Sequence, residues 1–317
     1  MNITQDACDL IGHTPLLEMK HIFKGAPARI LAKMENCNPT SIKDRAVQNM
    51  IRKAMKRGDI SQDTEVVEAS SGNTAIAIAS LGVIMGYKTR IFMSELCSVE
   101  RMQILCAYGA KIVQTPGIEH TKGARARAIA YCKANPDTTF FLNQHGNVDN
   151  GKAHESTTGP EIWEQTGGDV DAVVIGLGTS GTFDGLSRFF KNKNPRIEII
   201  GFEPASSPVY SGGKQGKHKL IGIGPGFITD NFKRSQKNLD EIVLVSDEIS
   251  YEYAREVARL EGLFVGPTSG ASVWVAGQLA QREGYAGKTI VCFMYDTGER
   301  YLSAEGLFPC VGIEKMD

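Results

Sequence analysis

Strand-like and helix-like stretches alternate along most of this chain, and this alternation constrains its fold more than any other feature. Strands are expected at 29–33, 64–68, 88–93, 111–114, 140–142, 172–175, 197–202, 264–265 and 289–294. Helices are expected at 47–57, 73–85, 99–108, 122–135, 158–165, 181–191, 248–260 and 271–282. Strands that are joined through helices run parallel, and the helices then cover both faces of the sheet. The sequence therefore predicts an α/β fold with parallel-rich sheets flanked by helices.

The alternation pauses near residue 150, and this pause divides the chain into two lobes. A chain of 317 residues is long enough for two hydrophobic cores. We expect one α/β lobe at 46–148 and a second at 149–317. The second contains a long irregular segment, 204–240, and loops of that length are usually functional or mobile. Because concave sites form at lobe interfaces and at the carboxyl ends of strands, an active site between the lobes is expected.

Composition excludes several classes of partner. The net charge is −1, so no basic surface for nucleic acid or for an anionic membrane is indicated. Seven scattered cysteines without a C-x-x-C pair are typical of free thiols in a reducing cytoplasm, so neither disulfides nor a metal site are expected. Because no signal peptide and no apolar run of roughly 18 residues is present, we expect a cytoplasmic protein without membrane spans.

Glycines at 176, 178 and 181 match the dinucleotide-binding fingerprint. The motif Gly176-x-Gly178-x-x-Gly181 follows an expected strand and opens an expected helix, and Glu203 ends the next strand. Taken alone, this context favours an NAD-dependent oxidoreductase. The alternative without a ligand is a tight turn between strand and helix.

The same loop is also suited to a smaller phosphate. Backbone N–H groups at a helix start bind any phosphate, not only a pyrophosphate. The loop adds three hydroxyl groups, which suit a compact phosphomonoester: those of Thr179, Ser180 and Thr182. The glycine loop therefore leaves two kinds of cofactor open.

Two further stretches open expected helices. Lys43 lies in the first turn after Ser41, where the helix dipole disfavours a cation, so the alternatives are a solvated lysine and a chemical role. The segment Ser70-Ser71-Gly72-Asn73-Thr74 precedes an apolar helix. Its hydroxyls and amide suit helix capping, and they equally suit the binding of a carboxylate at a helix N-terminus.

Together, these stretches resemble the cysteine synthase (O-acetylserine sulfhydrylase) and cystathionine β-synthase family, whose members use pyridoxal 5′-phosphate (PLP) for β-replacement. The resemblance runs from Ile11-Gly12-His13-Thr14-Pro15-Leu16 to Gly298-Glu299-Arg300-Tyr301-Leu302-Ser303. It includes Ser41-Ile42-Lys43-Asp44-Arg45, and Gly266-Pro267-Thr268-Ser269-Gly270-Ala271 as well. It implies a two-lobed, tryptophan synthase β-subunit-like PLP fold. The smaller mobile domain is then 46–148, and the larger PLP-binding domain is 1–45 plus 149–317.

The resemblance also implies roles for individual residues. Lys43 is the catalytic lysine and forms the Schiff base with the cofactor aldehyde. The remaining cofactor-binding residues are Asn73, Gly178, Thr179, Ser180, Gly181, Thr182 and Thr268, with Thr268 facing the pyridine nitrogen. The residues that bind the substrate carboxylate and its surroundings are Ser70, Ser71, Asn73, Thr74 and Gln144.

The reaction that the resemblance implies is β-replacement on a 3-substituted L-alanine through an α-aminoacrylate. The default is O-acetyl-L-serine plus sulfide, giving L-cysteine and acetate. A homodimer is implied, and family members bind serine acetyltransferase. Lys43→Ala is expected to abolish turnover.

Departures from the family pattern keep other readings open. The chain has Ser70 and Ser180 where Thr and Gly are usual, His145 where an aromatic residue is usual, and Thr229-Asp230 in place of Pro-Ala. His145 and Asp230 are candidate specificity residues, and the alternatives are a hydrogen-bonded loop histidine and an exposed carboxylate. The second reading is a cysteine β-lyase that releases sulfide and adds water or a thiol. An NAD-dependent oxidoreductase and a catalytically inactive member of the fold are the third and fourth.

Overall fold

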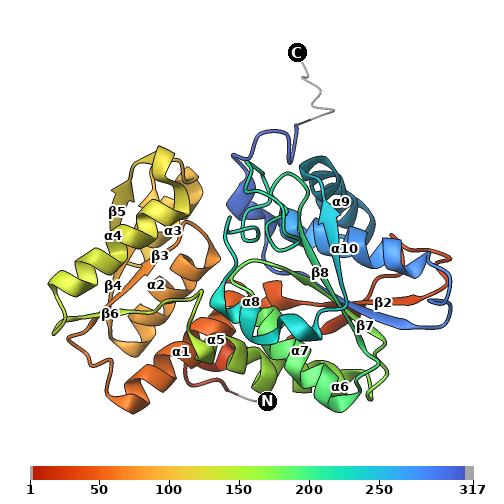
Figure 1. Ribbon diagram of the computed structural model, residues 1–317, viewed down its shortest axis with the longest axis horizontal. Coiled ribbons are helices and arrows are strands. Elements are labelled where there is room, and N and C mark those ends of the chain that lie inside the picture. The colour runs from red at the N-terminus through yellow and green to blue at the C-terminus, as the bar shows by residue number, and fades with distance from the viewer. Residues whose placement is uncertain (1–2, 311–317) are drawn as a thin grey trace.

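Two separate sheets form the framework of the molecule. The computed structural model describes residues 3–310. The larger sheet has the strand order β1-β2-β10-β7-β8-β9, and every pair is parallel except β1 with β2. Its strands are β1 (Leu16–Glu18), β2 (Arg29–Lys33), β7 (Ala172–Gly176), β8 (Glu198–Pro204), β9 (Glu241–Val245) and β10 (Thr289–Phe293). The smaller sheet is entirely parallel, in the order β5-β4-β3-β6, and lies beside the larger one (Figure 1).

The smaller sheet is built from one continuous part of the chain. Its strands are β3 (Glu65–Ala69), β4 (Lys88–Ser94), β5 (Lys111–Thr115) and β6 (Thr139–Phe141). Side chains alternate between the two faces: Val66 packs with the core beneath the N-terminal helices, whereas Val67 and Phe92 pack against Ala124 and Ala128 of α4. Both faces are therefore buried, as expected for a parallel sheet.

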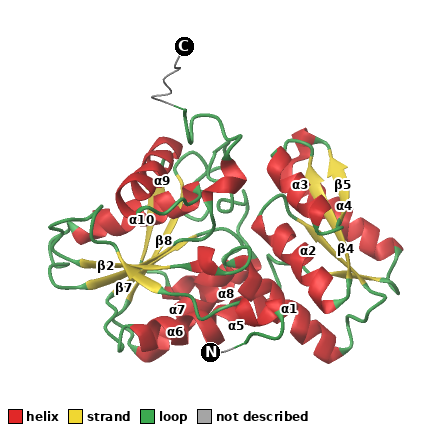
Figure 2. Ribbon diagram, turned by 180° about the vertical axis from the view of Figure 1, so that it is seen from behind, coloured by secondary structure: helices red, strands yellow, loops and turns green. Residues whose placement is uncertain are grey.

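Helices cover both sheets (Figure 2). The α-helices are α1 (Lys43–Arg57), α2 (Asn73–Met85), α3 (Val99–Ala107), α4 (His120–Ala134), α5 (Val148–Ala153), α6 (Gly159–Gln165), α7 (Gly181–Lys193), α8 (Asp230–Ser235), α9 (Asp247–Glu261) and α10 (Pro267–Ala280). A π-helical turn, His154–Thr158, joins α5 to α6. Short 3₁₀ turns lie at Ala7–Leu10, Glu35–Cys37, Gly117–Glu119, Gln236–Asn238 and Gly298–Tyr301.

Most expected elements are present, and the differences have local causes. The helix expected from 47 begins at Lys43, and the side chain of Asp44 accepts hydrogen bonds from the N–H groups of Thr40 and Ser41 at its start. Ile42 occupies the cap position, and Ser41, one residue before it, accepts a hydrogen bond from the Lys43 N–H at 3.3 Å. The expected strand 264–265 is only an isolated bridge from Val265 to Thr297. Strands β1 and β9 and helices α5 and α8 were not expected.

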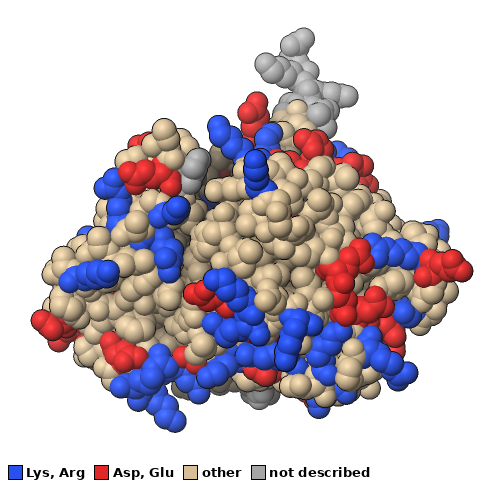
Figure 3. All heavy atoms as spheres, in the orientation of Figure 1, with Lys and Arg blue, Asp and Glu red and all other residues tan. Residues whose placement is uncertain are grey.

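Charged side chains of both signs lie on the surface. Acidic and basic side chains are mixed on the face shown in Figure 3, with more Lys and Arg along its lower edge. Among residues 3–310, no helix is both long enough and apolar enough to span a bilayer. The described residues also contain no group of three or more His, Cys, Asp or Glu side chains that is arranged to hold a metal ion.

Candidate active site

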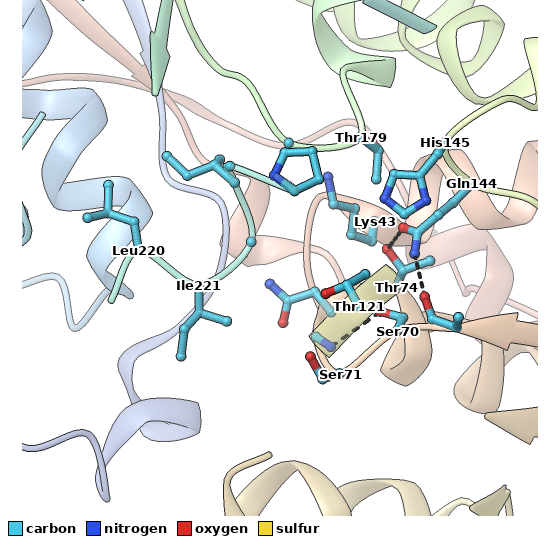
Figure 4. A pocket seen from close by; sticks show the side chains of 18 of the residues that line it. Lys43, Ser70, Ser71, Thr74, Thr121, Gln144, His145, Thr179, Leu220 and Ile221 are labelled. Atoms are coloured by element: carbon cyan, nitrogen blue, oxygen red, sulfur yellow. Dashed lines mark hydrogen bonds between the residues drawn. The ribbon is translucent and has the colours of Figure 1, made fainter. Parts of the chain in front are cut away.

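A cavity of about 250 Å³ lies where the carboxyl ends of strands from both sheets meet. Its wall includes Lys43, which follows β2 and the 3₁₀ turn, and residues 69–74, which follow β3. Gln144 and His145 follow β6, and Gly178 and Thr179 follow β7. Figure 4 shows these side chains converging from separate segments. Parallel sheets have their binding sites at the carboxyl ends of their strands. The cavity lies at these ends, where we expected an active site between the lobes.

Lys43 projects into this cavity (Figure 4). Burial lowers the pKa of its amine to about 8, although the nearby Asp296 carboxylate opposes this shift. The amine makes no salt bridge with any carboxylate of residues 3–310. A lysine whose pKa lies this far below its ordinary value has more of the uncharged amine near neutral pH than a solvated lysine, and because it faces a cavity it is suited to act as a nucleophile and a base.

Asp296 is a buried carboxylate that the sequence analysis did not single out. Its Oδ2 accepts hydrogen bonds from Asn73 Nδ2 at 2.6 Å and from the Tyr301 hydroxyl, while its Oδ1 has no partner among the described residues. It follows β10, the strand at the centre of the larger sheet. The signal for it was its position: an acidic residue three positions after the end of a largely apolar strand.

The loop Ser70–Thr74 and Gln144 form one hydrogen-bonded unit. The Thr74 hydroxyl donates to Gln144 Oε1 at 2.6 Å, and Gln144 Nε2 donates to the carbonyl of Ala69. Figure 4 shows these bonds, with Ser70 and Ser71 beside them. The N-terminus of α2 opens at this loop, so its free N–H groups and partial positive charge face the cavity. This arrangement suits a carboxylate.

Only part of the glycine loop lines the cavity, opposite the Ser70–Thr74 loop. Gly178 and Thr179 line the cavity, and a Cβ at Gly178 would lie 2.4 Å from the carbonyl oxygen of Gly222. Ser180 adopts φ +59°, a left-handed conformation in which glycine is favoured. Its hydroxyl donates to Tyr210 at 3.2 Å. The family's glycine at this position therefore has a conformational reason, and the chain holds a serine there by hydrogen bonding.

Four predicted cofactor residues do not line the cavity: Ser180, Gly181, Thr182 and Thr268. The Thr182 hydroxyl lies 3.3 Å from His154 Nε2, and Gly181 packs against Asn150. The Thr268 hydroxyl donates to the carbonyl of Ile221 at 2.9 Å, so it supports the loop in front of it.

The two predicted specificity residues occupy different surroundings. His145 lines the cavity, its Nδ1 is buried without a partner among the described residues, and its ring packs against Phe227. Burial lowers the pKa of His145 to about 4, aided by the charges of Arg125 and Lys43, so the ring is neutral. Asp230 is exposed, pairs with Lys233 at 3.1 Å and does not line the cavity.

Glu203 explains why the glycine loop is not a dinucleotide site. A dinucleotide-binding carboxylate must reach a ribose, but Glu203 is fully buried. Its two oxygens accept hydrogen bonds from the backbone N–H groups of Tyr210 and Ser211. The Glu203 carboxylate is therefore not available to a ribose, and the prediction of an NAD-dependent oxidoreductase depended on it.

Comparisons with known proteins agree with this geometry. The family model described as "Pyridoxal-phosphate dependent enzyme" matches residues 7–296. The chain is 41% identical to cysteine synthase A of Escherichia coli K12, over 99% of this chain and 98% of the relative. The chain belongs to the cysteine synthase family of PLP-dependent enzymes.

Solved structures of this family have the same fold. Cysteine synthase from Entamoeba histolytica superposes with a TM-score of 0.92 at 38% identity, covering 98% of this chain and 93% of that chain. A hydrogen sulfide-producing enzyme from Fusobacterium nucleatum gives 0.89 at 36% identity, covering 95% and 99%. The predicted family, α/β fold class and cofactor are confirmed.

The residues present fit PLP, the cofactor of this family. A cavity-facing lysine with a lowered pKa suits an aldehyde, and the start of α7 supplies free N–H groups beside Thr179 for a phosphate. Asn73 Oδ1 is buried without a partner among the described residues, which indicates a polar group missing from the site.

Proposed function

We propose that this enzyme converts O-acetyl-L-serine and sulfide into L-cysteine and acetate by β-replacement. The observation that carries the proposal is Lys43, which faces a cavity whose opposite wall is the N-terminus of α2. When bound, PLP supplies an electron sink that eases removal of an amino acid's α-proton and loss of its β-substituent. Cysteine synthase A of Escherichia coli supports this choice of substrates.

Each side chain of the cavity has a role in this proposal. Lys43 would hold the cofactor through its aldehyde, and after the substrate's amine has displaced it, the freed neutral amine of Lys43 would take the α-proton of the substrate. Ser71, Asn73 and Thr74 bind the substrate carboxylate at the start of α2, with Ser70 supporting the loop. Gln144 orients the Thr74 hydroxyl through their 2.6 Å hydrogen bond. Gly178 and Thr179, which line the cavity, would hold the phosphate end together with the loop residues Ser180, Gly181 and Thr182, and Thr268 would face the ring nitrogen.

A cysteine β-lyase is the second candidate, and His145 favours it. A neutral histidine in the cavity wall offers a polar group beside the substrate, where the family pattern has an aromatic ring. The hydrogen sulfide-producing enzyme from Fusobacterium nucleatum supports this reading. Asp230 remains a candidate only if the loop of α8 moves, because its carboxylate is exposed in this structure.

Product analysis with a matched pair of variants tests both candidates. The PLP-loaded protein is incubated with O-acetylserine plus sulfide, and separately with cysteine alone. Lys43→Ala is expected to make no cysteine, whereas Lys53→Ala, on the exposed side of α1, keeps full activity. Sulfide release from cysteine at a rate above cysteine synthesis would select the lyase. Full activity in Lys43→Ala would falsify both candidates.

We also propose a cytoplasmic homodimer made of two domains per chain. The division into a smaller mobile domain, 46–148, and a larger domain, 1–45 plus 149–317, is supported by the two separate sheets. Sedimentation velocity of the purified protein tests the dimer. Co-sedimentation with serine acetyltransferase, a partner of family members, tests whether this chain binds it.

A further inference from the structure

Glu68 is a buried carboxylate to which the proposed reaction assigns no role. It is the fourth residue of β3, a strand in which every residue is buried, and none of its surface is exposed. No Lys or Arg side chain of residues 3–310 lies within 4.0 Å of its oxygens. A buried carboxylate without a cation is costly unless hydrogen bonds compensate for the lost water. The hydrogen-bond partners of Glu68 therefore indicate what the residue does.

Those partners are two backbone N–H groups. Glu68 Oε1 accepts a hydrogen bond from the Ala69 N–H at 2.8 Å, and Oε2 accepts one from the Gln144 N–H at 2.9 Å. Burial raises the pKa of Glu68 to about 7, although these two bonds and the charge of Arg125 oppose the shift. At pH 8 the side chain is therefore mainly a charged carboxylate, and each of its oxygens accepts a bond from a different segment.

The two N–H groups belong to the two segments that carry the residues assigned to the substrate carboxylate. Ala69 directly precedes the Ser70–Thr74 loop, and Gln144 follows β6. Both segments line the cavity, whereas Glu68 is not among the residues of its wall. Glu68 thus stands behind the wall and contacts both parts of it.

The backbones of these two segments are not paired with each other in the described structure. The last backbone hydrogen bond between β3 and the chain after β6 runs from the Leu142 N–H to the Val67 carbonyl at 3.0 Å. Beyond it, side chains make the connection: the Glu68 carboxylate, and the Gln144 amide, which donates to the Ala69 carbonyl at 3.3 Å. The shorter and charged bridge through Glu68 therefore sets the spacing between the segments.

The position of Gln144 determines that of Thr74. The Thr74 hydroxyl donates to Gln144 Oε1 at 2.6 Å, and Thr74 lies in the first turn of α2 (Figure 4). The Gln144 carbonyl accepts hydrogen bonds from Asn150 and Asn231 of the larger lobe. Because hydrogen bonds weaken steeply when their geometry changes, a shift of Gln144 relative to Ala69 would disturb the binding of an anion at the start of α2.

We propose that Glu68 is a positioning residue for the substrate carboxylate, because its two oxygens fix the spacing between the Ser70–Thr74 loop and Gln144. The proposal rests on the proposed function, which assigns that carboxylate to the start of α2. The negative charge of Glu68 by itself repels a second carboxylate. Positioning and simple electrostatics therefore predict opposite effects when the charge is removed.

Two ligands that differ in the carboxylate test this role in the PLP-loaded enzyme. Calorimetric titration at pH 8 compares L-alanine with L-alaninamide, in which a neutral amide replaces the carboxylate. Glu68→Gln keeps the size of the side chain but turns an NH₂ group toward one of the two backbone N–H groups. It is expected to weaken the binding of alanine by at least about tenfold and to leave that of alaninamide within about twofold. In steady-state kinetics it is expected to raise the KM for O-acetylserine while kcat is retained.

Glu65→Gln is the matched control. Glu65 begins the same strand, is 7% exposed, pairs with Arg90 at 2.7 Å and does not line the cavity. Its replacement is expected to lower stability in urea denaturation without changing the affinity for either ligand. Glu68→Asp keeps the charge but is one methylene group too short to reach both N–H groups, so it is expected to weaken alanine binding as well. If Glu68→Gln does not fold, Glu68→Asp carries the comparison.

Several outcomes contradict the proposal. Unchanged or tighter binding of alanine in Glu68→Gln overturns it, and tighter binding shows that the charge only repels the ligand. Equal losses for alanine and alaninamide show general damage to the site and overturn it too. If the wild type binds both ligands equally, the assignment of the carboxylate to α2 is wrong and the proposal falls with it. Cysteine formation by the wild type from O-acetylserine and sulfide tests the proposed function independently of these titrations.

Discussion

Ser180 is a residue at which backbone conformation and side-chain bonding oppose each other. A non-glycine residue in a left-handed conformation costs about 1 kcal/mol or more. Ser180→Gly is therefore expected to stabilise the protein by about 1 kcal/mol in urea denaturation, since the strain exceeds the value of its 3.2 Å hydrogen bond to Tyr210. Ser180→Ala keeps the strain and loses the bond, so it is expected to destabilise. An order of stability other than Gly, Ser, Ala contradicts this account.

Lys43 is expected to destabilise the cofactor-free protein at neutral pH. Its pKa is about 8 when folded and returns to its ordinary value when unfolded, so below pH 8 folding carries the cost of burying a cation. This cost is roughly 3 kcal/mol at most and disappears as pH rises from 8 to above 10. Lys43→Met is thus expected to be more stable than the wild type at pH 7 and equal to it at pH 10.5. Urea denaturation at both pH values measures this.

Asp296 is expected to set the pH at which Lys43 reacts. Its charge raises the lysine pKa, so Asp296→Asn lowers it below 8. Only the uncharged amine bonds to an aldehyde. The rate at which cofactor-free protein takes up PLP is therefore expected to rise with pH through a lower midpoint in the variant. Asp63→Asn, whose side chain is 99% exposed, leaves the midpoint unchanged; a midpoint unmoved in Asp296→Asn contradicts the role.

Sequence patterns identified the site residues that belong to local motifs. They missed residues that reach the site only because the fold brings distant segments together. Lys43 and Thr74 stand at helix starts, where local rules apply, and both line the cavity. Asp296 is 253 positions from Lys43, so only the pairing of β10 with β2 brings their segments together. Lys122 of α4 and Lys217 likewise come from distant segments, and both line a second cavity of about 1180 Å³. Their shared cavity has no local signature.

Helices α1 and α6 are joined by a buried ion network. Arg45 donates to both oxygens of Glu161 and of Glu35, and Lys33 donates to Glu161 at 2.8 Å. Hydrogen bonds and charges from Arg45 and Lys33 outweigh desolvation and lower the pKa of Glu161 to about 2. The network anchors the segment that carries Lys43.

Breaking this network is expected to be costly. Glu161→Gln leaves two buried cations with one partner fewer, so it is expected to destabilise the protein by about 3 kcal/mol at pH 7. The difference shrinks as pH falls from 4.5 toward 2, because the wild-type carboxylate is then neutralised. Glu164→Gln, exposed on the same helix, changes stability by less than about 0.5 kcal/mol. Urea titrations across this pH range compare the three proteins.

Elements were predictable where periodicity was strong. The apolar helix α2 and the strands of the smaller sheet were placed within a few residues. The three-residue strand β1 is too short for a pattern, and the six-residue helices α5 and α8 are too short as well. Strand β9 carries an apolar run rich in β-branched residues, Ile-Val-Leu-Val, but it lies at the sheet edge directly after the irregular segment.

At the scale of the whole molecule, the substrate is expected to draw the two sheets together. Their cavity is bridged by the Asn73–Asp296 hydrogen bond, and a substrate carboxylate at α2 adds contacts from the same loop. Small-angle X-ray scattering of the PLP-loaded Lys43→Ala variant is expected to show a smaller radius of gyration with O-acetylserine than without it. An unchanged radius contradicts the mobility of residues 46–148.

The place of β10 in the larger sheet sets an order of events during synthesis. The smaller sheet is complete once residue 141 has left the ribosome, whereas β10, the last strand within residues 3–310, separates β2 from β7 at the centre of the other sheet. Until β10 is made, β2 has no parallel neighbour, and the apolar strands of the larger core stay exposed to solvent. While residues 142–293 are being made, a nascent chain of this protein therefore carries a finished half and an open half, and it is the open half that a chaperone would have to shield.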